Sequence, residues 1–430
     1  MATEQQIAVR NRVDAGLAKR YASERRFRAF GLLAVLVGLI FLVLFFSTIV
    51  SNGVSAFRQT MVVLPVMIDE ADVDPVGDRS RASLSDGDYD RVIRNALLEY
   101  FPDASGRRDR RAVVALVSIE SGYLLRDMVL ADPSLVGQRI ELTMPASSNV
   151  DMLMKGNVDR ALPQEQRVVS DQQVAWVDKL IADDRVAKSF NKALFTNGDS
   201  RDPELAGIRG AFVGSFYMLL VTLSIAFPLG VAAAIYLEEF APRNRWTDLI
   251  EVNINNLAAV PSIVYGLLGL AVFINWLALP RSAPLVGGLV LALLTLPVVI
   301  IAGRAAIKAV PPSIREAALG VGASKVQMVF QHVLPLALPG ILTGTIIGMA
   351  RALGETAPLL MIGMVAFIVD VPGGPLEPST ALPVQVYLWA DSPERAFVER
   401  TSAAIIVLLG FLLLMNLAAV LLRRKFERTW

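Results

Sequence analysis

Two opposite charges lie inside a long apolar stretch of the sequence. Arg351 and Glu355 are four residues apart, so a helix would place them on one face. An arginine near the centre of a bilayer costs about 2.5 to 3.5 kcal/mol on insertion scales and usually faces a partner or a wet cavity. The two charges could simply neutralise each other. We favour a pathway role, in which the planar guanidinium of Arg351 receives the oxygens of an anion and Glu355 orients it.

The rest of the sequence offers little for catalysis. It contains no cysteine and one histidine, His332, which excludes disulfides and thiolate chemistry and argues against a multi-histidine metal site. The patterns G-x-x-x-x-G-K-[ST], H-E-x-x-H and G-x-S-x-G do not occur. We therefore predict that the chain is not an enzyme, holds no cofactor and no metal, and takes its energy from another subunit.

Long apolar runs must position these charges. Hydrophobic residues make up 54% of the 430 residues and gather in runs long enough to span a bilayer, which predicts an all-α polytopic membrane protein. The first run, residues 30–50, follows a basic tail, residues 1–29, that is cytoplasmic by the positive-inside rule. A cleaved signal peptide is the alternative. We favour a retained helix, because the run is longer than the apolar region of a signal peptide, which usually has roughly 7 to 15 residues.

Residues 51–209 are charged throughout and have no membrane-length apolar run, which predicts a soluble α+β insert on the extracytoplasmic side. Strand character appears in residues 60–68 and 139–144. Helical periodicity begins at Tyr89, again after Arg111, and again behind the capping pair Ser170 and Gln173. The role and contacts of this insert do not follow from the sequence.

The transmembrane core is expected in residues 210–422. Its spans are expected at residues 211–237, 257–279, 285–302, 335–369 and 402–422, followed by a basic tail at residues 423–430. Because successive spans cross the membrane in opposite directions and basic residues mark the cytoplasmic side, both termini and the loop at residues 308–334 are expected in the cytoplasm. The fourth of these spans is too long for one straight helix, and Gly354 and Pro358 predict a break in it.

The loop at residues 308–334 carries two helix-capping patterns. Ser313 precedes Glu316, and Ser324 precedes Gln327, by the three residues of a capping box, so we predict two short helices. The glycines at positions 320 and 322 can supply the positive φ of a sharp connection. Pro335 predicts that the second helix ends near His332.

Three stretches resemble a known family. Glu316-Ala317-Ala318, then Gly322, then Leu334-Pro335 resemble the EAA loop of ABC importer permeases. ARALGETAPLL, residues 350–360, is similar to the signature of the PstA-like phosphate permeases, and VAAAIYLEEFA, residues 231–241, to their first core helix. The resemblance covers residues 206–430. His332 stands where many EAA loops have an apolar residue.

This resemblance implies a MetI-like ABC permease core of about five helices, here with an added N-terminal transmembrane helix and the α+β insert. It implies import of inorganic phosphate across the inner membrane. The partners would be a PstC-like second permease, a cytoplasmic ABC ATPase dimer and an extracytoplasmic phosphate-binding protein, with no nucleic acid. The alternatives are a permease for molybdate or sulfate, and a membrane sensor or scaffold in phosphate signalling.

The resemblance also assigns residues to roles. The expected substrate pathway consists of Arg351, Glu355 and Thr356. The expected ATPase-coupling loop consists of Glu316, Ala317, Ala318, Gly322, Leu334 and Pro335. Because hydrogen phosphate can donate a proton and sulfate cannot, Glu355 could also discriminate between the two anions.

Overall fold

The computed structural model describes residues 2–426, which divide into two units between Asn52 and Gly53. The first unit is the long helix α1 (Ala2–Val54), which covers both the predicted basic tail and the predicted first span. Its membrane-length apolar part lies within Arg20–Phe57. Apart from α1, the elements below belong to the second unit, which contains a small sheet domain and a helical bundle.

A three-stranded antiparallel sheet organises the insert. Its strands are β1 (Arg58–Met67), β2 (Arg139–Pro145) and β3 (Val186–Phe190), in the order β2-β1-β3. The register pairs Leu64 with Leu142, and Thr60 with Lys188. Alternate residues of β1 are fully buried, as its hydrophobic pattern predicts. The sequence prediction missed β3, which is short and mostly exposed and therefore lacks an apolar alternation.

Helices cover this sheet and close one apolar core. The core includes Leu64, Leu97, Phe101, Leu142 and Trp176. The capping box predicted for Ser170 and Gln173 is confirmed at the start of α8. The helices of the insert are α2 (Glu70–Val73), α3 (Arg81–Ser85), α4 (Tyr89–Tyr100), α5 (Arg107–Val114), α6 (Glu120–Ala131), α7 (Ser148–Met154), α8 (Asp171–Ala182) and α9 (Ala193–Thr196), with the 3-10 turns η1 (Ser55–Phe57), η2 (Pro133–Leu135) and η3 (Gln164–Gln166).

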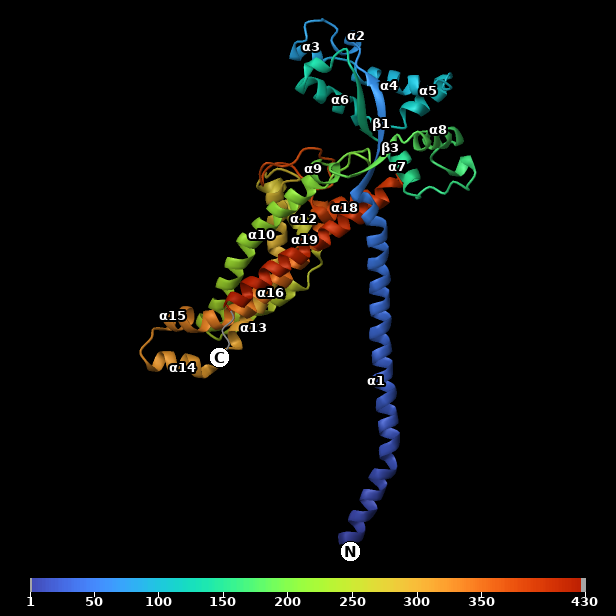
Figure 1. The fold of residues 1–430 in the computed structure, drawn as a ribbon. Coiled ribbons are helices and arrows are strands. Elements are labelled where there is room, and N and C mark those ends of the chain that lie inside the picture. The colour runs from blue at the N-terminus through green and yellow to red at the C-terminus, as the bar shows by residue number, and fades with distance from the viewer. Residues whose placement is uncertain (1, 427–430) are drawn as a thin grey trace. The chain divides into compact units, whose positions relative to one another are not determined.

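The bundle contains the long helices α10 (Arg209–Ile235), α13 (Pro284–Lys308), α16 (Leu334–Gly354) and α19 (Ala396–Phe426). They lie side by side, with the short helices α14 (Pro312–Gly320) and α15 (Lys325–Gln327) at the end opposite to the sheet domain (Figure 1). Small residues allow the close packing. A Cβ on Gly288 of α13 would lie 2.6 Å from the Cβ of Val221 on α10, and Thr222 donates a hydrogen bond to the Gly288 carbonyl at 3.1 Å.

The expected span at residues 257–279 is not a straight helix. Its residues are divided between the end of α11 (Arg245–Ala258), the helix α12 (Ser262–Gly269) and the π-helical turn η5 (Leu270–Trp276). The chain bends by 100° between α11 and α12. The bend falls at Pro261, which disfavours helical geometry in the residue before it.

The break predicted within the expected span at residues 335–369 is confirmed. Helix α16 ends at Gly354, and α17 (Ala357–Met361) follows after a two-residue interruption, where the sequence predicts a break. The segment between the expected spans 335–369 and 402–422 contains one more helix, α18 (Leu382–Ala390). The structure has five helices that are long and apolar enough to cross a membrane within the described residues, or six if the bent pair forms one span.

Two predictions about the loop at residues 308–334 are wrong. Ser313 caps no helix, because α14 begins one residue earlier with Pro312 in its first turn and Pro311 at the capping position. The second helix does not end near His332. It continues through the π-helical turn η6 (Met328–Val333) into α16, because the wider turn before Pro335 accommodates a residue without an N–H donor.

Two other predictions for this loop are confirmed. Gln327 N donates to Ser324 Oγ at 3.2 Å, and Ser324 N donates to Gln327 Oε1 at 2.9 Å, which completes the capping box. Gly322 adopts a φ of +89°, which lets the chain turn sharply between α14 and α15.

Candidate functional site

Arg351 and Glu355 form an ion pair at the interruption between α16 and α17. Arg351 lies in the last turn of α16, and its Nε is 3.4 Å from Glu355 Oε1. Glu355 has left the helix, with φ −77° and ψ 121°, so the pair bridges a helix end rather than one helical face. Thr356 follows in the capping position of α17, where its carbonyl accepts a hydrogen bond from Leu359 N at 3.0 Å.

The guanidinium of Arg351 uses only part of its hydrogen-bonding capacity within this chain. Its side chain is 48% exposed, whereas that of Glu355 is 19% exposed. Among the residues that the structure describes, Glu355 is its one hydrogen-bond partner. Ile347, one turn earlier on α16, is 62% exposed, while Ala352 and Leu353 are fully buried. One face of α16 therefore packs into this chain and the other presents an arginine beside an apolar surface.

The interruption itself is held by packing against α12. A Cβ on Gly266 of α12 would lie 2.7 Å from the Cα of Pro358, so the start of α17 rests directly on the α12 backbone. Leu359 and Met364 are fully buried below it. The break beside the ion pair is thus a fixed part of the core.

The EAA stretch lies on α14 and presents two kinds of surface. Ala318 is buried in an apolar cluster with residues of α10, α13 and η6, whereas Glu316 and Ala317 are exposed. Beyond Gly322 the chain turns into α15. Exposed apolar side chains surround this turn and are those of Leu319, Val321, Val326 and Phe330. Leu334 and Pro335 lie away from the turn, half-buried at the start of α16.

Arg315 ties α14 to the rest of the core, and the sequence analysis missed it. Its Nη2 and Nε lie 2.7 and 3.0 Å from Glu239 Oε1, at the end of α10 in the π-helical turn η4 (Tyr236–Phe240). It also donates to the carbonyl of Ile307 in the last turn of α13 at 2.8 Å, and to that of Val310, just after α13, at 2.6 Å. The carboxylate of Glu239 is only 7% exposed, so these two charge-assisted hydrogen bonds to one oxygen form a buried anchor.

Two further ion pairs, which share Arg304, lie beside this anchor. Arg304 of α13 contacts Glu238 at 3.4 Å and Glu251 of α11 at 3.0 Å. The acidic pair at positions 238 and 239, directly after an apolar run, was the signal in the sequence. Only the fold shows which arginine each carboxylate meets.

Comparison with known proteins defines the class. The family model described as "Binding-protein-dependent transport system inner membrane component" matches residues 226–428. A second model, described only as a domain of unknown function, matches residues 14–164. The first model covers most of the bundle, including both features above, and supports a multi-pass permease of the inner membrane.

Named relatives narrow this class. The chain is 35% identical over 219 residues to "Phosphate transport system permease protein PstA 1" of Mycobacterium tuberculosis H37Rv, covering 50% of this chain and 70% of that protein. It is 32% identical over 240 residues to the PstA of Xylella fastidiosa Temecula1, covering 55% and 82%. The chain belongs to the PstA-type permeases of the binding-protein-dependent transport family.

Other similarities are more partial. The chain is 39% identical over 155 residues to the "Probable ABC transporter permease protein YqgI" of Bacillus subtilis, but this match spans only 52% of that relative and 36% of this chain. A solved inward-facing structure of the MetNI methionine ABC transporter matches 51% of this chain with a TM-score of 0.41 and 17% identity, covering 96% of that chain. The family assignment does not depend on either.

Proposed function

We propose that this chain is the permease subunit of an ABC importer that carries inorganic phosphate across the inner membrane. The observation that carries the proposal is Arg351, half-exposed next to Glu355 at an interruption within the bundle. A charge in this position is expensive unless a partner or a wet pathway receives it. The names of the PstA relatives support phosphate as the substrate.

The geometry of the pair suits an anion with several oxygens. Glu355 meets Nε of Arg351 and so leaves the two Nη groups free to donate in parallel to phosphate oxygens. The carboxylate of Glu355 would accept a hydrogen bond from the O–H group of hydrogen phosphate and would repel sulfate, which has no such donor. Thr356, next along the chain, completes the proposed substrate pathway.

The surfaces of the core suggest where partners bind. The exposed face of α16 with Ile347 and Arg351 would meet a PstC-like second permease, so that the pathway lies between two subunits. The exposed turn around Val321, with Glu316 beside it, would insert into a cytoplasmic ABC ATPase dimer. An extracytoplasmic phosphate-binding protein would deliver the substrate at the opposite end, where residues 51–209 lie.

The proposed topology follows from this arrangement. Both termini, residues 1–29 and 423–430, and the loop at residues 308–334 would be cytoplasmic. Closure of the ATPase would push α14. Its buried anchor at Arg315 would then pass the movement to α10 and α13, which pack against each other and contact the helix that carries Arg351.

The direct experiment is uptake of labelled phosphate by the assembled transporter in proteoliposomes, with ATP hydrolysis measured in parallel. Arg351→Met should reduce uptake at least tenfold while the protein remains inserted. Arg281→Met is the matched control, because Arg281 is exposed in a loop outside the long helices. Wild-type uptake by Arg351→Met would remove the pathway assignment.

Coupling has its own test. Glu316→Ala should leave ATP hydrolysis intact and lower the phosphate carried per ATP, because Glu316 is exposed where the ATPase would bind. Full uptake in that variant would exclude the proposed coupling role of Glu316.

The alternative substrates differ in a competition assay. In a phosphate permease, excess molybdate or sulfate should leave the uptake of labelled phosphate unchanged. In a molybdate or sulfate permease, the transported anion should compete at the same concentrations. A sensor or scaffold would show no uptake at all, although deletion of the chain would still alter the phosphate response of the cell.

A further inference from the structure

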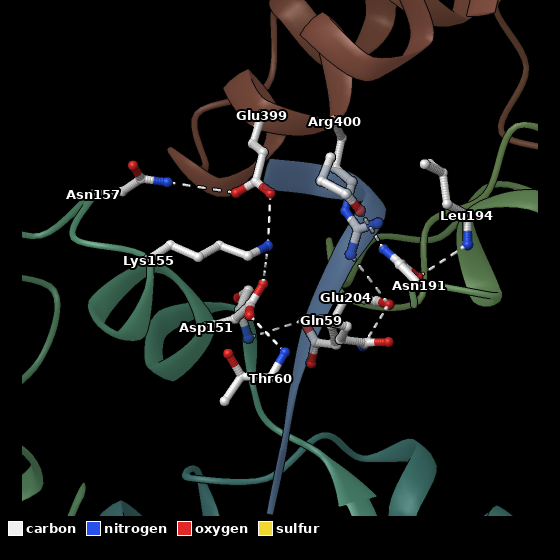
Figure 2. Close-up of polar contacts among 12 residues, drawn as sticks. Gln59, Thr60, Asp151, Lys155, Asn157, Asn191, Leu194, Glu204, Glu399 and Arg400 are labelled. Carbon is white, nitrogen blue, oxygen red and sulfur yellow. Dashed lines mark hydrogen bonds and ion pairs between the residues drawn. The ribbon is translucent and has the colours of Figure 1, made fainter. Parts of the chain in front are cut away.

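The sheet domain meets the first turn of α19 through a cluster of buried charges. Lys155, which directly follows α7, lies 2.7 Å from Asp151 of α7 and 2.6 Å from Glu399 of α19. Figure 2 shows the lysine between the two carboxylates. All three side chains are buried, with 10% or less of each exposed. These ions are therefore poorly screened by solvent, and each depends on the other two.

The carboxylates of this cluster are themselves anchored. Asp151 Oδ1 accepts a hydrogen bond from the backbone N–H of Thr60 in β1 at 2.9 Å, which links the cluster to the sheet. Glu399 Oε2 lies 3.5 Å from Asn157 Nδ2, a second contact from the insert. The sheet domain thus grips one residue of α19 from two points.

The neighbouring residue of α19 is held as well. Arg400 is 4% exposed and donates to the carbonyl of Glu204 at 3.5 Å. Gln59 of β1 donates to the same carbonyl at 3.3 Å, and the Glu204 carboxylate accepts from Ser148 N at the start of α7 at 3.2 Å. Consecutive residues of α19 are therefore joined to β1 and α7 by separate sets of polar contacts (Figure 2).

At its other end α19 contacts the helix that carries Arg351. Arg423 Nη1 donates to Thr343 Oγ1 on α16 at 3.3 Å, and the two helices pack against each other. Thus α19 connects the sheet domain at one end with the pathway helix at the other.

We propose that the sheet domain and α19 move as one body, with Lys155 as the positioning residue of the junction. The domain is then an extracytoplasmic lever on the bundle: a protein that binds the domain changes the tilt of α19, and through it the position of α16. The effect on transport rests on the function proposed above, whereas the rigid junction does not.

A spin-label distance measurement tests the junction. The chain has no cysteine, so Arg94→Cys on α4 and Tyr387→Cys on α18, the helix that packs against α19, introduce the sole labelling sites, both exposed. The full-length protein should give one narrow distance distribution between the labels. Lys155→Met should broaden it at least twofold, because Asp151 and Glu399 are left without their shared counter-ion.

Two control variants keep the test specific. Lys188→Met removes an exposed lysine from β3 of the same domain and should leave the distribution narrow. Lys155→Arg keeps the charge and should also leave it narrow. An unchanged width in Lys155→Met, or equal broadening in Lys188→Met, would overturn the rigid junction. If Lys155→Met does not accumulate, Glu399→Gln makes the same test from the α19 side.

Phosphate uptake is the second readout. Lys155→Met should lower uptake several-fold at equal amounts of inserted protein, while Lys188→Met should not. Broadening of the distances without a loss of uptake would refute the lever and leave the function proposed for the permease untouched. Absence of uptake in the unaltered protein would instead count against that function, since the distance measurement does not require transport.

Discussion

Replacing Arg315 with methionine should free α14 from the membrane helices while keeping most of the side-chain volume. Arg315 makes two hydrogen bonds to the Glu239 carboxylate and two to carbonyls in and just after the last turn of α13. Methionine makes none of them, and Glu239 stays buried without a counter-ion.

The size of the effect follows from this burial. Breaking a buried ion pair by removing one partner costs about 3 to 5 kcal/mol. The Arg315 side chain is 21% exposed, so water can replace part of what is lost, and we take the lower end, about 3 kcal/mol. At roughly 1.4 kcal/mol for each factor of ten, α14 should open about 100-fold more often.

Hydrogen exchange followed by mass spectrometry measures this opening. Peptides covering α14 should exchange about 100-fold faster in Arg315→Met, whereas peptides from α4 in the sheet domain should not change. In the assembled transporter, more ATP should be hydrolysed for each phosphate carried, because pushing α14 no longer moves α10 and α13.

Two variants make the test decisive. Arg243→Met removes an exposed arginine near the same end of α10 and should leave the exchange of α14 as it is. Adding Glu239→Gln to Arg315→Met should recover part of the loss, since no carboxylate is then buried alone. Exchange of α14 within about threefold of wild type in Arg315→Met would refute the reasoning.

Three further predictions concern other sites. Gly322→Ala, at φ +89°, should strain the turn by about 1 to 2 kcal/mol and lower uptake per ATP, whereas Gly320→Ala, where a Cβ meets open space, should not. Glu355→Gln should let sulfate compete with phosphate uptake; unchanged exclusion of sulfate would contradict the selectivity role. Burial raises the pKa of Glu204. Above that pKa the buried carboxylate is charged and lowers the stability of the fold, and this loss of stability disappears as the pH falls and the group takes up a proton. Glu204→Gln should therefore raise the melting temperature near pH 8, with a gain that vanishes towards pH 4; a gain that does not vary with pH would exclude this origin.

The sequence alone predicts the features that depend on local patterns. Apolar runs flanked by basic residues place the long helices, and the alternation in residues 60–68 places the central strand. The capping box at Ser324 is equally local, because donor and acceptor lie within three residues of each other. The same pattern fails at Ser313, where Pro312 is a better first residue for the helix.

The interactions that connect the parts could not be predicted. Lys155 and Glu399 are 244 residues apart, and Arg315 and Glu239 are 76 apart, so no periodicity relates them. Each partner also looks like an ordinary surface charge in its own segment. Their burial depends on how the sheet domain and the helices pack, which is a property of the whole fold.

The largest difference between expectation and structure lies at Pro335, and it changes the proposed mechanism. A helix that ended near His332 would leave a flexible joint between the coupling loop and the pathway. Instead, Lys325–Gly354 forms one helix of 30 residues, about 45 Å long at 1.5 Å per residue. Its first residues adjoin the exposed turn around Val321, and its last turn carries Arg351. A push at the turn would then reach the guanidinium along one continuous helix, which ends at Gly354 beside the proposed phosphate contact.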